Sequence, residues 1–267
     1  MTEEMPQNEA RRKRAKRWGM WLMLPLVAGM VLLVVFASEW RETLTVQRIV
    51  IEGSRVMSAQ QVYALANIPM KTPLYALDLL SAKRRVLAQP FIQSVSFHRQ
   101  YTGVLRIRVT ERTPIASLNN GQMRLLDAHG ILLPFIPSSV KLDVPMISGI
   151  DGIGRALLGE RLTSPEVKTA IEVLQTAQAV DSSMFHFISE INMNSGKDIM
   201  LYSNDLGVPI NLGRGEIAKK LLMLQSFWHG FVKTASAEKL QSIDLRYEDQ
   251  VVVRWQNEGK RPTKTVL

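Results

Sequence analysis

The sequence predicts an α+β protein with a single N-terminal transmembrane helix followed by two folded domains. Residues 19–38 form an uncharged, mostly apolar run long enough to cross a bilayer. Residues 44–113 show the order strand, helix, helix, strand, strand, which predicts a small sheet with both helices on one face. Residues 114–255 are dominated by strand signals and contain two helical patterns, which predicts a mixed β-sheet domain with two helices.

The run 19–38 is the predicted transmembrane helix. A helix of 20 residues is about 30 Å long, which matches the hydrocarbon thickness of a bilayer. Trp18, Trp21 and Trp40 flank the run, and tryptophan favours the membrane interface because its ring is apolar and its N–H needs a polar partner. Pro25 and Gly29 are compatible with a helix in lipid.

The stretch 11–17, RRKRAKR, predicts the orientation of this span. Short flanks rich in Lys and Arg stay in the cytoplasm, so residues 1–18 are expected inside as a basic tail and the rest of the chain outside. A cleaved signal peptide is the alternative, but its apolar core is usually shorter and ends in a small-residue cleavage site. The basic stretch is also compatible with binding to nucleic acid or anionic lipid.

Composition narrows the functional classes. The chain has a net charge of +9, of which residues 18–267 carry +6, and no aromatic and basic stripe supports nucleic-acid binding. The absence of cysteine excludes disulfides, thiolate catalysis and Cys-ligated metal. The four histidines, His98, His129, His186 and His229, lack metal-ligand spacing. We therefore predict no metal, no cofactor and no small-molecule substrate.

The first exported domain is predicted over residues 39–113. Alternating apolar residues predict a strand over 47–51, and Ser58 is a candidate N-cap for a helix that ends before Pro69. Asp78 is a candidate cap for a second helix, on which Lys83, Arg84 and Arg85 face solvent. A hairpin follows, with alternation around 95–97 and 105–109 and a turn at 101–103.

The second exported domain is predicted over residues 114–255. Strands are expected at 115–118, 123–126, 131–133, 188–193, 199–202, 208–212 and 250–255. Prolines mark a loop that ends at 146–149. One helix begins at Ser164-Pro165, with the cap and proline in their preferred places, and the other covers Glu216 to Phe231. Residues 256–267, QNEGKRPTKTVL, are predicted to be a disordered tail.

Two sequence features are candidates for catalytic or ligand sites. The stretch 211–215, NLGRG, is a glycine-rich turn before a helix, a place where phosphate can bind. It lacks the spacing of a Walker loop or a dinucleotide fingerprint, so an ordinary strand-to-helix turn is favoured. Glu248 and Asp249 resemble a glycosidase pair only in composition, because adjacent strand residues point to opposite faces. The chain is predicted not to be an enzyme, and an anchored cell-wall hydrolase is the rival class.

The last strand is the candidate binding element. Val251, Val253 and Trp255 alternate with Val252 and Arg254. A terminal strand often lies at a sheet edge, where unpaired main-chain groups can accept a partner's strand. A position in the interior of the sheet is the alternative.

Several segments resemble a known family. VQRIVIEGSRVMSAQQV and QPFIQSVSFHRQYTGVLRIRVTERTPIA, in that order of elements, resemble a POTRA domain. Together with the basic tail, the span, NLGRG and DLRY, they resemble the FtsQ/DivIB family of bacterial cell-division proteins. The resemblance implies a single-pass inner-membrane protein with its bulk in the periplasm at the septum. It also implies a scaffold that binds FtsB and FtsL through its terminal region.

The resemblance also indicates interface residues. Tyr247 and Trp255 match the family's contact pattern, and the predicted partner-binding set adds residues of the last strand and the turn before it. The set is Tyr247, Asp249, Val251, Val253 and Trp255. A POTRA-bearing export or assembly factor is the alternative function, which a uniform rather than midcell distribution would reveal.

Overall fold

The computed structural model describes residues 25–36, 44–119, 121–136, 142–194, 197–232 and 239–255. The chain divides into two compact units. The first contains the residues up to Val86 together with Val95–Val109, and the second contains Leu87–Ser94 and the residues from Thr110 onward.

The predicted transmembrane run falls only partly within the described residues. Residues 25–36 are helical, and large apolar side chains such as Leu26, Leu33 and Phe36 are exposed on them. The remainder of the run, the predicted cytoplasmic tail at 1–18 and the predicted tail at 256–267 lie outside the described residues. Among the helices of the described part, none has both the length and the apolar character needed to cross a membrane.

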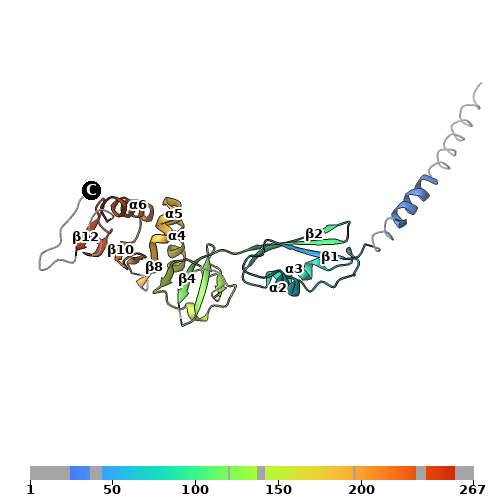
Figure 1. The fold of residues 1–267 in the computed structure, drawn as a ribbon, viewed down its shortest axis with the longest axis horizontal. Coiled ribbons are helices and arrows are strands. Elements are labelled where there is room, and N and C mark those ends of the chain that lie inside the picture. The colour runs from blue at the N-terminus through green and yellow to red at the C-terminus, as the bar shows by residue number, and fades with distance from the viewer. Residues whose placement is uncertain are drawn as a thin grey trace, which may run out of the picture. The chain divides into compact units, whose positions relative to one another are not determined.

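The first unit has the predicted order of elements (Figure 1). Its sheet has the order β1-β3-β2, and β1 runs parallel to β3 with Ile49 opposite Leu105 and Ile51 opposite Ile107. These four side chains point to the same sheet face, because paired residues on neighbouring strands share a face. The elements are β1 (Arg48–Glu52), α2 (Ala59–Ala66), α3 (Leu79–Leu87), β2 (Ile92–Gln100) and β3 (Val104–Glu111).

The helices α2 and α3 both start at the predicted caps. The Ser58 Oγ accepts a hydrogen bond from the Gln61 N–H at 3.2 Å, and the Gln61 side chain accepts one from the Ser58 N–H at 2.8 Å, which is a capping box. The Asp78 carboxylate accepts from the Ser81 N–H at 3.0 Å at the start of α3. Ala82 and Val86 are buried while Lys83, Arg84 and Arg85 are exposed, as predicted.

The second unit contains one nine-stranded mixed sheet in the order β12-β11-β10-β9-β8-β7-β4-β5-β6. Three neighbouring pairs, β4 with β7, β7 with β8 and β10 with β11, are parallel. Its strands are β4 (Pro114–Asn119), β5 (Met123–Asp127), β6 (Leu132–Pro134), β7 (Met146–Ser148), β8 (Ile188–Asn192), β9 (Ile199–Ser203), β10 (Pro209–Gly213), β11 (Leu240–Asp244) and β12 (Val252–Trp255). Its α-helices are α4 (Pro165–Val180), α5 (Ser182–Phe187) and α6 (Ile217–Phe227).

The apolar faces of the helices form part of the core of the second unit. Ser164 caps α4 by accepting from the Val167 N–H, and the predicted stripe Val167, Ile171 and Leu174 is buried. The rings of Phe187 and Trp228 meet edge to face with their centroids 4.5 Å apart. These residues belong to one apolar cluster that also includes residues of β8, β10 and β12, so the last strand is part of the same core.

Two strands and one α-helix of the second unit were not predicted. The strand β7 has three residues and lies where a loop was expected to end. The helix α5 begins directly after α4, because Asp181 ends one helix and caps the next by accepting from the Ser183 N–H. The strand β11 covers residues for which the sequence predicted no strand. The second predicted helix also differs, since α6 ends at Phe227 and a π-helical turn, Trp228–Val232, follows it.

Candidate partner-binding edge

The strand β12 lies at one end of the nine-stranded sheet (Figure 1). It pairs antiparallel with β11, with Ile243 opposite Val253 and Asp244 opposite Val252. Among the described strands, no other pairs with β12. Half of the main-chain N–H and C=O groups of an edge strand point away from its neighbour, so β12 offers hydrogen-bonding groups along its outer side.

The opposite edge of the sheet is covered by the chain itself. The edge strand β6 is short, and Leu132 uses its main chain on a neighbouring loop. The Leu132 N–H donates to the Glu160 carbonyl at 2.9 Å, and the Leu132 carbonyl accepts from the Gly159 N–H at 2.7 Å. Ile131 and Arg161 form a further bridge. Within the described part of the chain, β12 is therefore the edge that remains available for strand addition.

The two faces of β12 differ in what they offer a partner. Val251 and Val253 are each 1% exposed and belong to the core, so only their main-chain atoms can reach an added strand. Arg254 is exposed and Val252 is half-buried on the other face. Trp255 is half-buried and packs against the core at the end of the strand.

The turn before β12 presents the other two predicted residues. The Tyr247 side chain is 53% exposed. The Gln250 N–H donates to the Tyr247 carbonyl at 3.4 Å, which closes the turn. Asp249 has a φ of +53°, which short polar residues such as Asp tolerate better than most. The turn thus places an aromatic ring and a carboxylate in solvent beside the open edge.

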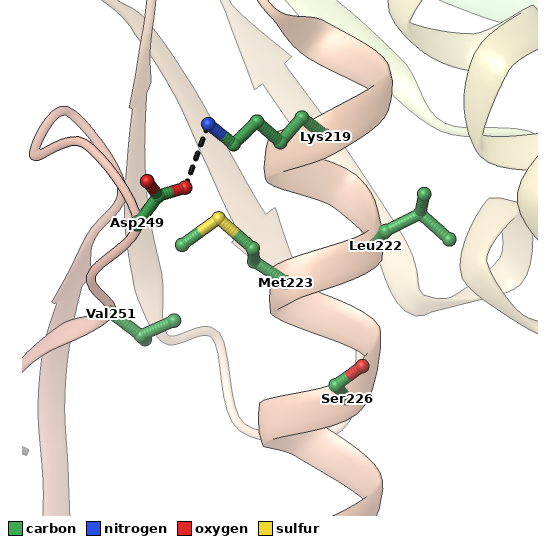
Figure 2. A pocket seen from close by; sticks show the side chains of 6 residues that line it. All are labelled: Lys219, Leu222, Met223, Ser226, Asp249 and Val251. Carbon is green, nitrogen blue, oxygen red and sulfur yellow. Dashed lines mark ion pairs between the residues drawn. The ribbon is translucent and has the colours of Figure 1, made fainter. Parts of the chain in front are cut away.

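A groove lies between this turn and α6 (Figure 2). It has a volume of about 570 Å³. The Lys219 Nζ lies 2.7 Å from the Asp249 Oδ1, and this hydrogen bond raises the pKa of Lys219. Figure 2 shows the Met223 side chain directed toward the segment that carries Asp249 and Val251. The lining residues are Lys219, Leu222, Met223, Ser226, Asp249 and Val251.

The sequence also contains a signal for the helical wall of this groove, although no groove was predicted there. Residues 221–224, LLML, are four consecutive apolar residues in a helix. Four in a row exceed the width of one buried stripe, so at least one must face outward. Leu221 and Leu224 are buried, whereas Leu222 is 50% exposed and Met223 is half-buried in the groove.

The glycine-rich stretch 211–215 is a strand-to-helix turn, as predicted. It connects β10 to α6, and the side chains of Lys220 and Arg246 lie against it. The Lys220 Nζ is buried and donates to the carbonyls of Leu212 and Arg214 at 3.0 and 2.9 Å. A Cβ on Gly213 would lie 2.6 Å from the Arg246 Cγ, so the absence of a side chain there gives Arg246 its space.

Arg246 in turn ties β11 to the chain before β9. Its Nη2 lies 2.7 Å from the Asp244 Oδ2, and its Nη1 lies 3.0 Å from the Asp198 Oδ2. Burial opposes ionisation of Asp244, but the hydrogen bonds from Arg246 outweigh it and lower the pKa of that carboxyl. The two sequence motifs NLGRG and DLRY therefore meet in one structural contact at the base of the β12 turn.

Metal coordination has no support in the described residues. No group of three or more His, Asp or Glu side chains lies close enough together there to hold an ion. Among the described residues, the geometry around β12 combines an open main-chain edge, an exposed tyrosine and an apolar groove.

Comparison with known proteins decides the family. The profile "POTRA domain, FtsQ-type" matches residues 44–112, and "FtsQ/DivIB, C-terminal related" matches residues 113–253, more than half of the chain. The chain belongs to the FtsQ/DivIB family. The first unit is accordingly a POTRA fold and the protein is α+β, as predicted.

Two similar proteins are both called cell division protein FtsQ. The one from Rhodothermus marinus is 32% identical over 264 residues, which cover 94% of each chain. The one from Salinibacter ruber is 29% identical over 238 residues, which cover 86% of this chain and 90% of the relative. Membership of the FtsQ family confirms the prediction of a division-associated protein that is not an enzyme.

Proposed function

We propose that the protein is a membrane-anchored scaffold of the division complex whose strand β12 accepts a strand of FtsB from an FtsB–FtsL pair. It transfers no chemical group. By holding this pair outside the cytoplasm it links early to late division proteins at the septum. The edge at β12, where β11 is the only described strand that pairs with it, is the observation on which this proposal rests, because main-chain pairing requires an edge with unpaired groups.

The residues around β12 have separate roles in the proposed complex. The main chain of 251–255 supplies hydrogen bonds, and the buried Val251 and Val253 hold the strand on its own core. Tyr247 and Trp255 supply side-chain contact, since aromatic residues bury a large area at a small cost in rotamer entropy. The groove beside α6 is lined by Val251, the residue directly before β12, so an added strand can direct an apolar side chain into it.

The anchor completes the proposal. Residues 19–38 cross the inner membrane as a single helix, residues 1–18 remain in the cytoplasm, and the POTRA domain (39–113) and β domain (114–255) lie in the periplasm. The uncharged run and the basic stretch 11–17 support this topology.

Binding of FtsB tests the proposed interface. Tyr247→Ala and Trp255→Ala, alone and together, are compared with Tyr101→Ala, which removes an 84% exposed tyrosine from a POTRA turn. We expect each interface substitution to weaken binding of the periplasmic segment of FtsB by about tenfold or more, as for an aromatic hot spot. The control should bind normally. Unchanged binding by a folded double variant would remove both side chains from the interface.

Cellular distribution separates this function from the export alternative. A fluorescent fusion of the full chain is expected to form a midcell ring. A uniform envelope signal would favour a POTRA-bearing export factor.

A further inference from the structure

The two family-matched regions carry opposite net charges. Residues 44–112 contain ten Lys and Arg and three Asp and Glu, a net charge of +7. Residues 113–253 contain 12 and 15, a net charge of −3. The excess positive charge of the folded protein is therefore concentrated in the POTRA domain.

Part of this charge is already paired. Arg106 and Arg108 on β3 both form ion pairs with Glu52. Lys83 and Arg84 on α3 differ, because no ion pair involves either of them in the described part of the chain. Asp78, the acidic residue beside them, caps α3 and also attracts Arg84 without forming an ion pair with it, and the Arg84 Nη2 donates a hydrogen bond to the Ser81 Oγ at 3.2 Å.

The exposed face of α3 combines these cations with an apolar side chain. Leu80, Lys83 and Arg84 are spaced i, i+3 and i+4, so they share one face of the helix. Leu80 is 65% exposed. An exposed leucine beside lysine and arginine is the composition of a helix that lies at a membrane interface, where the leucine enters the acyl boundary and the cations meet phosphate groups.

We propose that this face, Leu80, Lys83 and Arg84, docks on the anionic phospholipid headgroups of the membrane in which the chain is anchored. The inference rests on the proposed anchor. The predicted span ends at Ser38 and the described domain begins at Leu44, so only residues 39–43 separate them, at most about 20 Å of chain. A tether this short gives a weak surface contact a high effective concentration.

A single fluorophore tests this docking. The chain has no cysteine, so Leu80→Cys provides one labelling site for an environment-sensitive dye, and His98→Cys on β2 provides an exposed comparison site. The full chain is reconstituted in nanodiscs of phosphatidylcholine alone or mixed with phosphatidylglycerol. We expect blue-shifted, brighter emission from position 80 only in anionic discs, lost on addition of salt, and no change from position 98.

Charge variants assign the effect to α3. Lys83→Gln with Arg84→Gln should lower the ratio of docked to free α3 about 30-fold, from about 1 kcal/mol per cation near an anionic surface. The matched pair Arg155→Gln with Lys168→Gln removes the same charge from exposed positions of the β domain and should leave the emission unchanged.

Each outcome has a distinct meaning. Two results in a chain retained by the discs would overturn docking by α3 and leave the anchor intact. One is emission that does not depend on lipid charge, and the other is emission that the α3 substitutions and the matched β-domain substitutions reduce equally. A chain that neither disc retains would overturn the anchor and this inference together. A shift caused by adding the periplasmic segment of FtsB in neutral discs, without one from anionic lipid, would overturn lipid docking and assign α3 to protein contact. FtsB binding through β12 should be the same in both charge variants.

Discussion

At the scale of single residues, the motifs around β12 are explained by contacts between segments far apart in the sequence. The sequence predicted that NLGRG is a turn, because a strand pattern precedes it and a helix pattern follows it. It did not predict why Gly213 is needed. Its φ is +64° and Arg246 crosses directly over it, which only the folded chain reveals.

Substitution of Gly213 measures this crowding. Gly213→Ala should lower the free energy of unfolding by about 2–3 kcal/mol, because positive φ costs about 1 kcal/mol and the contact with Arg246 adds strain. Gly207→Ala is the control, since Gly207 has a φ of +63° but a Cβ added there would meet no atom within 4 Å. It should cost only about 1 kcal/mol. Equal decreases in the free energy of unfolding, measured by urea denaturation, would show that the Arg246 side chain moves aside without an energetic cost.

The ion pair of Arg246 and Asp244 predicts a pH dependence. The pKa of Asp244 is lowered from its usual 3.8, so the native state binds fewer protons than the unfolded state near that pH. The resulting stabilisation is present above about pH 4 and is lost as the pH falls through the lowered pKa.

Comparison with Asp244→Asn measures this contribution. The wild-type protein should lose stability more steeply below pH 4 than the variant in urea titrations at a series of pH values. Parallel curves for the two proteins would contradict a stabilising role for the ionised carboxylate.

At the scale of elements, the sequence predicted the last strand and its alternation but not the groove that α6 forms beside it. The terminal position favoured an edge, and β12 lies at one. Strand β11 was missed because its pattern is short and its neighbours, β10 and β12, are brought to it only by tertiary folding. The groove was missed for the same reason, since α6 and the 247–250 turn meet only in the folded domain.

The groove makes a prediction about α6. Leu222→Ser should weaken binding of the FtsB segment by about tenfold, because the leucine is 50% exposed before binding and would bury more of its apolar surface against the partner. The same exposure means that the substitution should cost little stability in the free protein. Leu206→Ser removes a leucine of similar exposure, 44%, from the turn between β9 and β10. That control should bind normally, and equal effects of the two substitutions on titrated affinity would exclude the groove from the interface.

At the scale of the whole molecule, the α+β class and the order of elements in the POTRA domain were predictable because each strand and helix carries a local periodicity. The order of the nine-stranded sheet was not, since it joins β4 to β7 and β10 to β11 through parallel pairs that no local pattern specifies. Short elements such as β7 and α5 carry too few residues for a periodic signal.

The open edge of that sheet is the feature on which the proposed function depends. Hydrogen–deuterium exchange of the full chain, with and without the FtsB segment, tests it most directly. Strand addition predicts new protection of main-chain amides in 252–255 and no change at β6, whose main chain is already paired with the loop at 159–160. Protection confined to other parts of the chain, with β12 unchanged in the complex, would contradict the account.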